Sequence, residues 1–240
     1  MSRVITIAHL YPREMNIYGD LGNIITLVKR LEWRGFRAEV APVEIGEKFD
    51  FGAVDLVFGG GGQDSGQEVV APDLMKRGEI LRTLATDGMP MLVICGLYQL
   101  FGQEFVTLEG KKLPGIAVFN TTTNGSKVRM IGNVTVETEA FGRLVGFENH
   151  SGQTILAESQ GALGKVVKGF GNNSTSGFEG SRSGAAIGTY LHGPVLPRNP
   201  RLADFLLATA LRRRYGVDKL SRLDDTWESS AASVADSRPQ

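Results

Sequence analysis

The chain has 240 residues, which is enough for one domain with a substantial buried core. Hydrophobic residues make up 42% and charged residues 22%, as in ordinary globular proteins, and the formal net charge of +0 argues against nucleic acid or an anionic membrane as a partner. No apolar run approaches the roughly 20 residues of a membrane-spanning helix, and the first residues lack a secretory signal pattern. We therefore expect a cytoplasmic protein.

The first half of the chain alternates strand patterns with helix patterns. Short apolar runs rich in Val and Ile predict strands over residues 4–8, 55–58 and 91–94. Apolar residues at helical spacing predict helices over residues 21–33 and 74–85. Asp20 is the expected N-cap of the first helix, and Pro72 precedes the second. Strands that are apolar almost throughout and are separated by helices predict an α/β fold, a mainly parallel sheet with helices on both faces.

The second half has a different pattern. Strand-like segments with polar or glycine-rich turns follow one another at residues 127–139, 144–157 and 164–170, which predicts an antiparallel extension of the same sheet. A parallel-type strand over residues 185–191 and a last helix over residues 202–214 complete the predicted domain, residues 1–222. Residues 223–240 are polar, small and aperiodic, so we predict a disordered C-terminal tail.

Cys95 is the only cysteine in the chain and directly follows the predicted strand 91–94. A single cysteine forms no internal disulfide, which favours a reducing compartment. A lone buried cysteine is usually a small core hydrophobe. Gly96 and the residues after it have helical character, however, and a side chain at a sharp strand-to-helix turn is exposed beside free N–H groups. Because such a position favours the thiolate, the turn indicates a nucleophile.

Two further loops follow predicted strands. Residues 59–62 are four consecutive glycines, which let the backbone approach a ligand closely, whereas two glycines alone would indicate a flexible turn. His192 ends the last predicted strand and is the best placed base for a cysteine nucleophile, although a strand-end histidine by itself is more often structural. His9 and His150 are weaker candidates. One cysteine and three histidines do not favour a metal site.

Taken together, these motifs resemble those of a known family. ICGLYQ (94–99) resembles the nucleophile elbow of class I, triad-type glutamine amidotransferases, GGGGQD (59–64) their oxyanion loop, and YLHG (190–193) the segment with their catalytic histidine. Further motifs resemble the cobyric acid synthase-like, or CobB/CobQ-like, branch: GFENHSGQT (146–154), NIYGDLGN (16–23) and RMIGN (129–133). The resemblance runs from about residue 3 to 215 and implies a flavodoxin-like class I glutamine amidotransferase domain.

The resemblance implies an L-glutamine-hydrolysing enzyme in which Cys95 and His192 are catalytic. The Cys95 thiolate would attack the side-chain amide, giving a γ-glutamyl thioester and ammonia, while His192 moves the protons. Arg129 would bind the substrate carboxylate through paired N–H donors, although by itself it would be read as an exposed strand charge. Gln99 is also expected to bind substrate. Backbone N–H groups are expected to form the oxyanion hole, at Gly60, Gly61 and Gly96.

Within this branch the chain resembles the glutaminase subunits of lipid II isoglutaminyl synthases, which work with a MurT-like partner of the Mur-ligase family. The resemblance implies a heterodimer in which the partner binds ATP and Mg²⁺, whereas this chain needs no cofactor. The ammonia would amidate the α-carboxylate of D-glutamate in the lipid II stem peptide, a step in peptidoglycan and cell wall biosynthesis that affects cell shape. Alternatives are an amidotransferase subunit for a cobyrinate-type cofactor precursor, another hydrolase on the same fold, and a non-catalytic binding module.

The chain departs from the family pattern at two places. Leu97 stands where the usual elbow has glycine, and a branched side chain there is expected to crowd the turn or the glutamine pocket. The usual H-x-E pattern is missing, because Gly193 and Pro194 follow His192. A third catalytic acid is then unnecessary, or it comes from elsewhere in this chain, with Glu148 a weak candidate, or from the partner.

Overall fold

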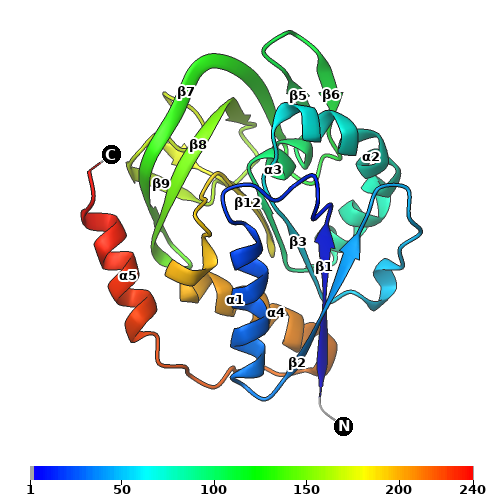
Figure 1. Cartoon of the computed structure of the whole chain (residues 1–240), viewed down its shortest axis with the longest axis vertical. Coiled ribbons are helices and arrows are strands. Elements are labelled where there is room, and N and C mark those ends of the chain that lie inside the picture. The colour runs from blue at the N-terminus through cyan, green and yellow to red at the C-terminus, as the bar shows by residue number, and fades with distance from the viewer. Residues whose placement is uncertain (1–2, 240) are drawn as a thin grey trace.

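The computed structural model describes residues 3–239, which form two β-sheets and the helices around them (Figure 1). The first sheet has six strands in the order β11-β12-β4-β3-β1-β2, and all neighbouring pairs are parallel except β11 with β12. Its strands are β1 Val4–Leu10, β2 Arg37–Val43, β3 Leu56–Gly59, β4 Met91–Ile94, β11 Ser181–Ser183 and β12 Ala186–Thr189. Every residue of β3, β4 and β12 is buried, as their apolar sequences predict.

Helices cover both faces of this sheet. The helices beside this sheet are α1 Leu21–Glu32, α2 Asp64–Thr86, α3 Gly96–Leu100 and α4 Pro200–Tyr215, whereas α5 Thr226–Ser237 contacts the second sheet. The β1–α1–β2 and β3–α2–β4 connections run in opposite directions along the strand order, so right-handed crossovers place α1 and α2 on opposite faces. α4 packs with α1 and contacts β1 and β3. The predicted α/β fold, a mainly parallel sheet between helices, is confirmed.

The helix α2 begins at Asp64 and not at residue 74, so Pro72 lies inside it. A proline inside a helix removes one backbone hydrogen bond, and here the buried neighbours Val70 and Leu74 anchor the helix on either side. As a consequence, the first turn of α2 directly follows the glycine loop. Although α2 has 23 residues, neither it nor any other helix within residues 3–239 is long and apolar enough to cross a membrane.

The antiparallel part of the chain forms a second sheet and does not extend the first one. Its strands are β5 Glu104–Val106, β6 Lys112–Pro114, β7 Thr121–Thr138, β8 Gly142–Leu156, β9 Gly164–Lys168 and β10 Phe178–Glu179, in the order β10-β9-β7-β5-β6 with β8 paired to β7. The short strand β11 already occupies the edge beside β12, so no edge is left there for the long β7–β8 ribbon. This ribbon arches beside the first sheet (Figure 1), and a bridge between Phe147 and His192 links the two.

The carboxyl ends of four parallel strands meet at one end of the first sheet. The direction of the crossovers reverses between β1 and β3, and open α/β sheets bind ligands outside the carboxyl ends of their strands at such a reversal. Residues 11–20 follow β1, the glycine loop closes β3, Cys95 follows β4, and His192 comes shortly after β12. The fold therefore gathers segments that lie far apart in the sequence.

The C-terminal segment contains a helix, α5, where the sequence predicts disorder. α5 buries none of its side chains, and its Trp227 is 84% exposed, so apolar burial does not explain where it lies. Polar contacts with the second sheet position it instead, because Asp236 accepts hydrogen bonds from Thr135 at 2.8 Å and from Arg143 at 2.9 Å. A polar, aperiodic sequence carries no signal for contacts of this kind.

Candidate active site

Cys95 lies at the sharp turn between β4 and α3. Its backbone has φ +49° and ψ −105°, a conformation that L-residues rarely adopt, and its N–H donates to the Thr189 carbonyl oxygen at 2.9 Å. The side chain is 5% exposed and lines a pocket. Strained backbone at a strand-to-helix turn is the geometry of a nucleophile elbow. Cys95 is therefore placed as the sequence predicts, and its catalytic role stays a prediction.

Leu97 does not crowd this pocket. Its side chain is fully buried and is not among the described side chains that line the pocket. Instead it packs against Gly59 at the end of β3, where an added Cβ would lie 2.3 Å from Leu97 Cδ1. The expected crowding is wrong because the first glycine of the loop makes room for the branched side chain of the elbow.

The glycine loop packs directly against the elbow. A Cβ added to Gly96 would lie 3.0 Å from the backbone nitrogen of Gly62, which itself lines the pocket. Within residues 3–239 the Gly62 N–H has no hydrogen-bond acceptor, whereas the Gly61 N–H donates to Asp20 Oδ2 at 2.6 Å. The Gly62 N–H is therefore free to donate to a ligand beside Cys95. The three assignments to the oxyanion hole, those of Gly60, Gly61 and Gly96, stay predictions.

His192 is fully buried beside Cys95, in the segment after β12. Its backbone pairs with Phe147, and its Cε1 lies 2.8 Å from the place of a Cβ on Gly61. Burial by itself lowers the pKa of His192, but the negative charges of Cys95 and Asp20 outweigh burial and raise it to about 10. The arrangement stabilises an imidazolium beside the sulfur, which is the charge state that a cysteine–histidine pair needs for nucleophilic attack.

Asp20 is an acid that the sequence analysis did not place in the site. Its side chain is fully buried, and its Oδ1 lies 3.5 Å from His192 Nδ1. The prediction that Asp20 caps the following helix is wrong in one respect, because its carboxylate makes no cap hydrogen bond and turns to Gly61 and His192. The sequence signal was the motif NIYGDLGN, which does not by itself say which of its residues faces the site.

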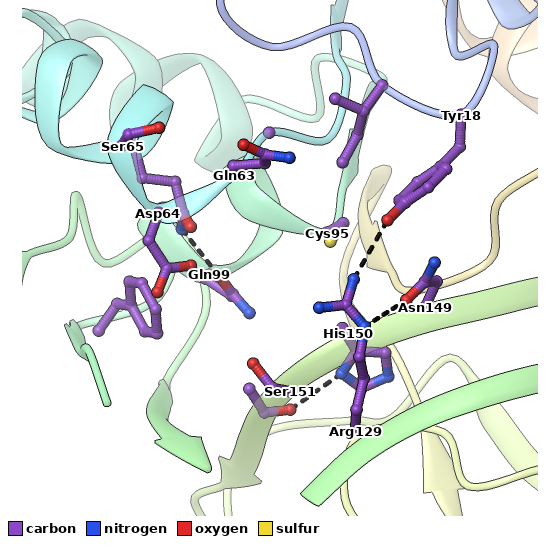
Figure 2. A pocket seen from close by; sticks show the side chains of 15 residues that line it. Tyr18, Gln63, Asp64, Ser65, Cys95, Gln99, Arg129, Asn149, His150 and Ser151 are labelled. Atoms are coloured by element: carbon purple, nitrogen blue, oxygen red, sulfur yellow. Dashed lines mark hydrogen bonds between the residues drawn. The ribbon is translucent and has the colours of Figure 1, made fainter. Parts of the chain in front are cut away.

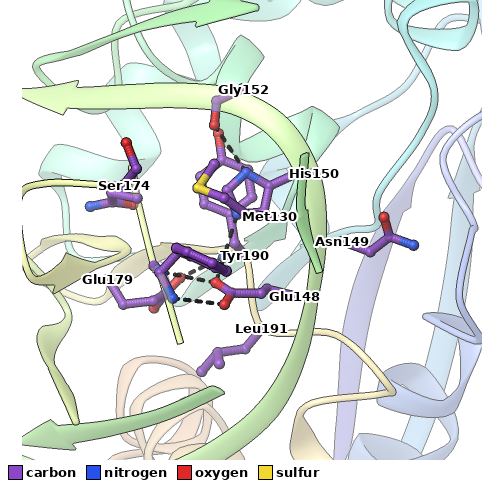
Figure 3. Close-up of polar contacts among 12 residues, drawn as sticks. Met130, Glu148, Asn149, His150, Gly152, Ser174, Glu179, Tyr190 and Leu191 are labelled. Atoms are coloured by element: carbon purple, nitrogen blue, oxygen red, sulfur yellow. Dashed lines mark hydrogen bonds and ion pairs between the residues drawn. The ribbon is translucent and has the colours of Figure 1, made fainter. Parts of the chain in front are cut away.

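Glu148 does not face His192. Its carboxylate is fully buried and accepts hydrogen bonds from the N–H groups of Phe170 at 2.7 Å and Gly171 at 2.8 Å (Figure 3). Burial raises the pKa of Glu148, and these two donors partly offset the rise. Glu148 therefore serves to fix the chain between β9 and β10 against β8, and it is not the acid of a triad.

The other two histidines are buried and neutral. His150 stacks on the Tyr190 ring with centroids 3.6 Å apart (Figure 3), and burial lowers its pKa to about 3. His9 packs against Phe58, and burial lowers its pKa to about 4. His150 contributes to the pocket wall, whereas His9 belongs to the core. Within residues 3–239 no three His, Cys, Asp or Glu side chains lie close enough together to hold a metal ion.

A pocket of about 350 Å³, the size range of small-molecule sites, opens in front of Cys95 (Figure 2). Its lining comes from the loop after β1, the glycine loop, α2, the elbow with α3, β5 and the β7–β8 ribbon. The lining includes one carboxyl group, that of Asp64, and one guanidinium group, that of Arg129. Figure 2 shows Asp64 and Arg129 on opposite sides of the opening, with Cys95 above the Arg129 side chain in this view. A pocket of this kind suits a small ligand with both charges.

Arg129 reaches the pocket because β7 bulges. The pairing of β7 with β8 is interrupted at residues 126–129, and a bulge re-aims the side chains it carries. Arg129 Nε donates to Asn149 Oδ1 at 2.7 Å, and its Nη2 donates to the Tyr18 hydroxyl at 3.3 Å (Figure 2). A guanidinium has five N–H donors, so donors remain for a carboxylate. The structure thus holds Arg129 over the opening, while its binding role stays a prediction.

Gln99 lies in the pocket wall and is 5% exposed. Its Oε1 accepts from Gln67 Nε2 at 2.8 Å, and its Nε2 donates to the Tyr190 hydroxyl at 3.0 Å. Gln67 Nε2 also donates to the Gly96 carbonyl oxygen at 3.0 Å. These bonds tie the elbow to α2 and to the segment after β12. Gln99 therefore holds the wall in place, and its contact with substrate stays a prediction.

The fold and this geometry define a class I glutamine amidotransferase domain. Residues 6–200 match the family model of the CobB/CobQ-like glutamine amidotransferase domain, and the chain belongs to this family. The match lies within the predicted domain 1–222, whose boundary at residue 222 stays a prediction.

Individual proteins and one solved structure are also similar to this chain. The chain is 36% identical over 230 residues to the lipid II isoglutaminyl synthase (glutamine-hydrolyzing) subunit GatD of Staphylococcus aureus, covering 96% of this chain and 94% of that protein. It is 42% identical over 217 residues to the GatD subunit of Streptococcus pneumoniae, covering 89% and 83%. A probable cobyric acid synthase of Methanothermobacter thermautotrophicus is 27% identical over 239 residues, which cover 89% of this chain and 46% of that protein. The crystal structure of a Thermotoga maritima glutamine amidotransferase, 17% identical, has the same fold with a TM-score of 0.54, covering 96% of this chain and 93% of that chain.

Proposed function

We propose that this chain is the glutaminase subunit of a lipid II isoglutaminyl synthase. It hydrolyses L-glutamine to glutamate and ammonia, and a MurT-like partner of the Mur-ligase family consumes the ammonia in an ATP-dependent amidation. The observation that carries the proposal is the identity of 36% and 42% with two GatD subunits over most of both chains. The cobyric acid synthase, in contrast, is matched over 46% of its length.

The charges of the pocket fit glutamine as a zwitterion. Arg129 binds the α-carboxylate with the N–H donors that are not bonded to Asn149 and Tyr18. Asp64, across the opening, accepts the α-ammonium group (Figure 2). Glutamine held at both charged groups extends its side-chain amide toward Cys95, the nucleophile at the back of the pocket.

The reaction begins with the Cys95 thiolate beside the His192 imidazolium. The sulfur attacks the carbonyl carbon of the side-chain amide, and the amide oxygen takes up negative charge that the Gly62 and Gly96 N–H groups stabilise. His192 gives its proton to the amide nitrogen, the C–N bond breaks, and ammonia leaves a γ-glutamyl thioester. Neutral His192 then takes a proton from the attacking water, the C–S bond breaks, and glutamate leaves the restored ion pair.

The ammonia is used on the partner subunit. Forming an amide from a carboxylate requires activation, and the chain contains no G-x-x-x-x-G-K-[ST] motif, so ATP and Mg²⁺ bind to the partner. The acceptor is the α-carboxylate of D-glutamate in the stem peptide of lipid II. The heterodimer therefore acts in peptidoglycan biosynthesis, on the cytoplasmic side of the membrane. The alternative acceptor is a cobyrinate-type cofactor precursor, which the CobB/CobQ-like family match supports.

The test is isotope transfer by the chain purified together with its co-purifying subunit. With glutamine labelled by ¹⁵N in its amide, ATP and a lipid II stem substrate, we expect mass spectrometry to find the label in the stem amide. The Cys95→Ala complex should transfer no label from glutamine and should still use free ammonia. Label in a corrinoid carboxylate, with none in the stem, would select the alternative.

A further inference from the structure

The imidazole of His192 lacks the partner that would normally orient it. Within residues 3–239 neither ring nitrogen of His192 forms a hydrogen bond, and Asp20 Oδ1 is likewise without one. All of these atoms are buried, and buried polar atoms cost free energy unless they are paired. Asp20 Oδ1 and His192 Nδ1 lie 3.5 Å apart, so a shift of about 0.3 Å would bring them within hydrogen-bond distance.

We infer that Asp20 is the positioning acid of the site, supplied by this chain from the loop after β1. It takes the place of the acid that the sequence lacks after His192. A carboxylate at Nδ1 fixes the tautomer and orientation of the ring, so that Nε2 carries the proton that is passed to ammonia. The inference rests on the proposed function only in taking glutamine hydrolysis as the reaction.

The second carboxylate oxygen of Asp20 contacts the glycine loop. Oδ2 accepts the Gly61 N–H at 2.6 Å, and a Cβ on Gly60 would lie 3.1 Å from this oxygen. The carboxylate therefore fits only against bare glycine backbone. One buried side chain thus holds both the base and the glycine loop, and sets the position of one relative to the other.

The same loop also contacts the substrate-binding side. Tyr18 places its ring edge against His192 with centroids 5.0 Å apart, and its hydroxyl accepts from Arg129 at 3.3 Å. Asp20 and Tyr18 flank Gly19, whose φ of +81° lets the chain turn sharply between them. Substitution of Asp20 is therefore expected to affect mainly the base, His192, and to affect substrate binding by Arg129 only weakly.

The charges around His192 predict a pH signature. Cys95 of the elbow, and Asp20 and Tyr18 of the loop after β1, lie against His192, and His150 of β8 and Glu179 of β10 are the other titratable groups whose charges interact with it. Cys95 and Asp20 raise the pKa of His192, whereas burial keeps His150 neutral and raises the pKa of Glu179 to about 8. Loss of the Asp20 charge should therefore lower the pH at which the imidazolium loses its proton.

The test is Asp20→Asn in the full chain and in its complex. Asparagine keeps an oxygen for the Gly61 N–H and loses the charge that faces His192. We expect kcat for glutamine hydrolysis to fall about 10- to 100-fold with little change in KM, and the alkaline limb of the pH profile to move to lower pH. The control is Asp55→Asn, which removes another buried carboxylate, one that accepts the Thr6 N–H at 2.9 Å in the first sheet. The control should keep the kcat of the unmodified chain.

An Asp20→Asn protein that keeps kcat within twofold and an unmoved alkaline limb would overturn the inference. A second measurement needs no variant: ¹⁵N NMR of the histidines in the unmodified protein should show a proton on His192 Nδ1 near neutral pH. An unprotonated Nδ1 would contradict the role of Asp20 whether or not the variant folds. Failure of the unmodified chain to hydrolyse glutamine would instead count against the proposed function.

Discussion

The parallel sheet and the β7–β8 ribbon supply different halves of the site. Cys95 and His192 follow β4 and β12, whose residues are all buried, so packing fixes the backbone that carries them. Arg129 is exposed and reaches the pocket from a bulge in β7, where it donates hydrogen bonds to Asn149 and Tyr18. The predicted reacting groups thus lie on the buried parallel-sheet half of the site, and the residue predicted to bind the substrate carboxylate lies on the exposed ribbon half.

This difference follows from what each task requires. Nucleophilic attack and proton transfer need the reacting atoms held to within fractions of an ångström, whereas an ion pair with a substrate tolerates more movement. Substitutions in the first half should therefore act on kcat and those in the second half on KM.

The largest effect is expected at the elbow. Cys95→Ala should reduce glutamine hydrolysis about 10⁴-fold or more, because no second thiol exists, and should leave the fold intact. Cys95→Gly should be equally inactive but more stable than Cys95→Ala by about 1 kcal/mol, because φ of +49° strains any residue with a Cβ. Turnover assays and thermal unfolding measure both. Activity in pure, folded Cys95→Ala protein would remove Cys95 from the mechanism.

A smaller effect is expected on the ribbon, at Arg129. Arg129→Ala should raise KM for glutamine about 10- to 150-fold, which corresponds to a lost charge-assisted hydrogen bond of about 1.5–3 kcal/mol, and should leave kcat nearly unchanged. Its stability should change by less than about 0.5 kcal/mol, because the side chain is exposed. Arg129→Lys keeps the charge but not the paired donors, so its KM should lie between those of the unmodified chain and of Arg129→Ala. An unchanged KM in Arg129→Ala would assign the carboxylate to another residue.

Substitution of Asp64 should also raise KM for glutamine, but by less than substitution of Arg129. Asp64→Asn should raise KM about fivefold, because an exposed ion pair contributes at most about 1 kcal/mol. The unmodified chain should prefer glutamine to an analogue without the α-amino group, and Asp64→Asn should prefer it less. Glu68→Gln is the matched control, since Glu68 lies on the same helix, pairs with Lys111 and is outside the described pocket lining. An equal preference for glutamine over this analogue in the unmodified chain and in Asp64→Asn would show that Asp64 does not bind the ammonium group.

One buried histidine of the second sheet should make the chain less stable in acid. Burial lowers the pKa of His150 to about 3, below the ordinary value of 6.5, so protonation favours the unfolded chain. The stability it contributes is present above pH 6.5 and is lost as the pH falls toward 3. His150→Phe, which keeps a ring on Tyr190, should lose about 1–2 kcal/mol less than the unmodified chain between pH 6.5 and 5. Denaturant unfolding at both pH values measures this, and equal losses would show that His150 does not titrate on unfolding.

The parallel-sheet half could largely be predicted from the sequence. Cys95 comes directly after an apolar strand and His192 comes three residues after another, and parallel strands bring their carboxyl ends to one edge, so local patterns were enough to bring the two residues together. The helix pattern likewise predicted α1 and α4 closely. The start of α2 was wrong because Pro72 was taken as a boundary.

Contacts between distant segments could not be read in this way. Asp20 has the spacing of an N-cap, and only the packing of the loop after β1 against Gly61 turns its carboxylate inward. Leu97 fits the elbow because Gly59, on another strand, leaves room for it. The second sheet and α5 depend on which strand edge is free and on polar contacts across the surface, neither of which leaves a periodic pattern.

In the proposed mechanism, Cys95 attacks a glutamine that Arg129 holds by its carboxylate. Intact-mass analysis after treatment with a diazoketone analogue of glutamine tests it most directly, because the chain has one cysteine. We predict a single adduct on Cys95, slowed by excess glutamine and slowed about 10- to 150-fold by Arg129→Ala at low reagent concentration. An unlabelled Cys95, or labelling that neither glutamine nor Arg129→Ala affects, would rule out this mechanism.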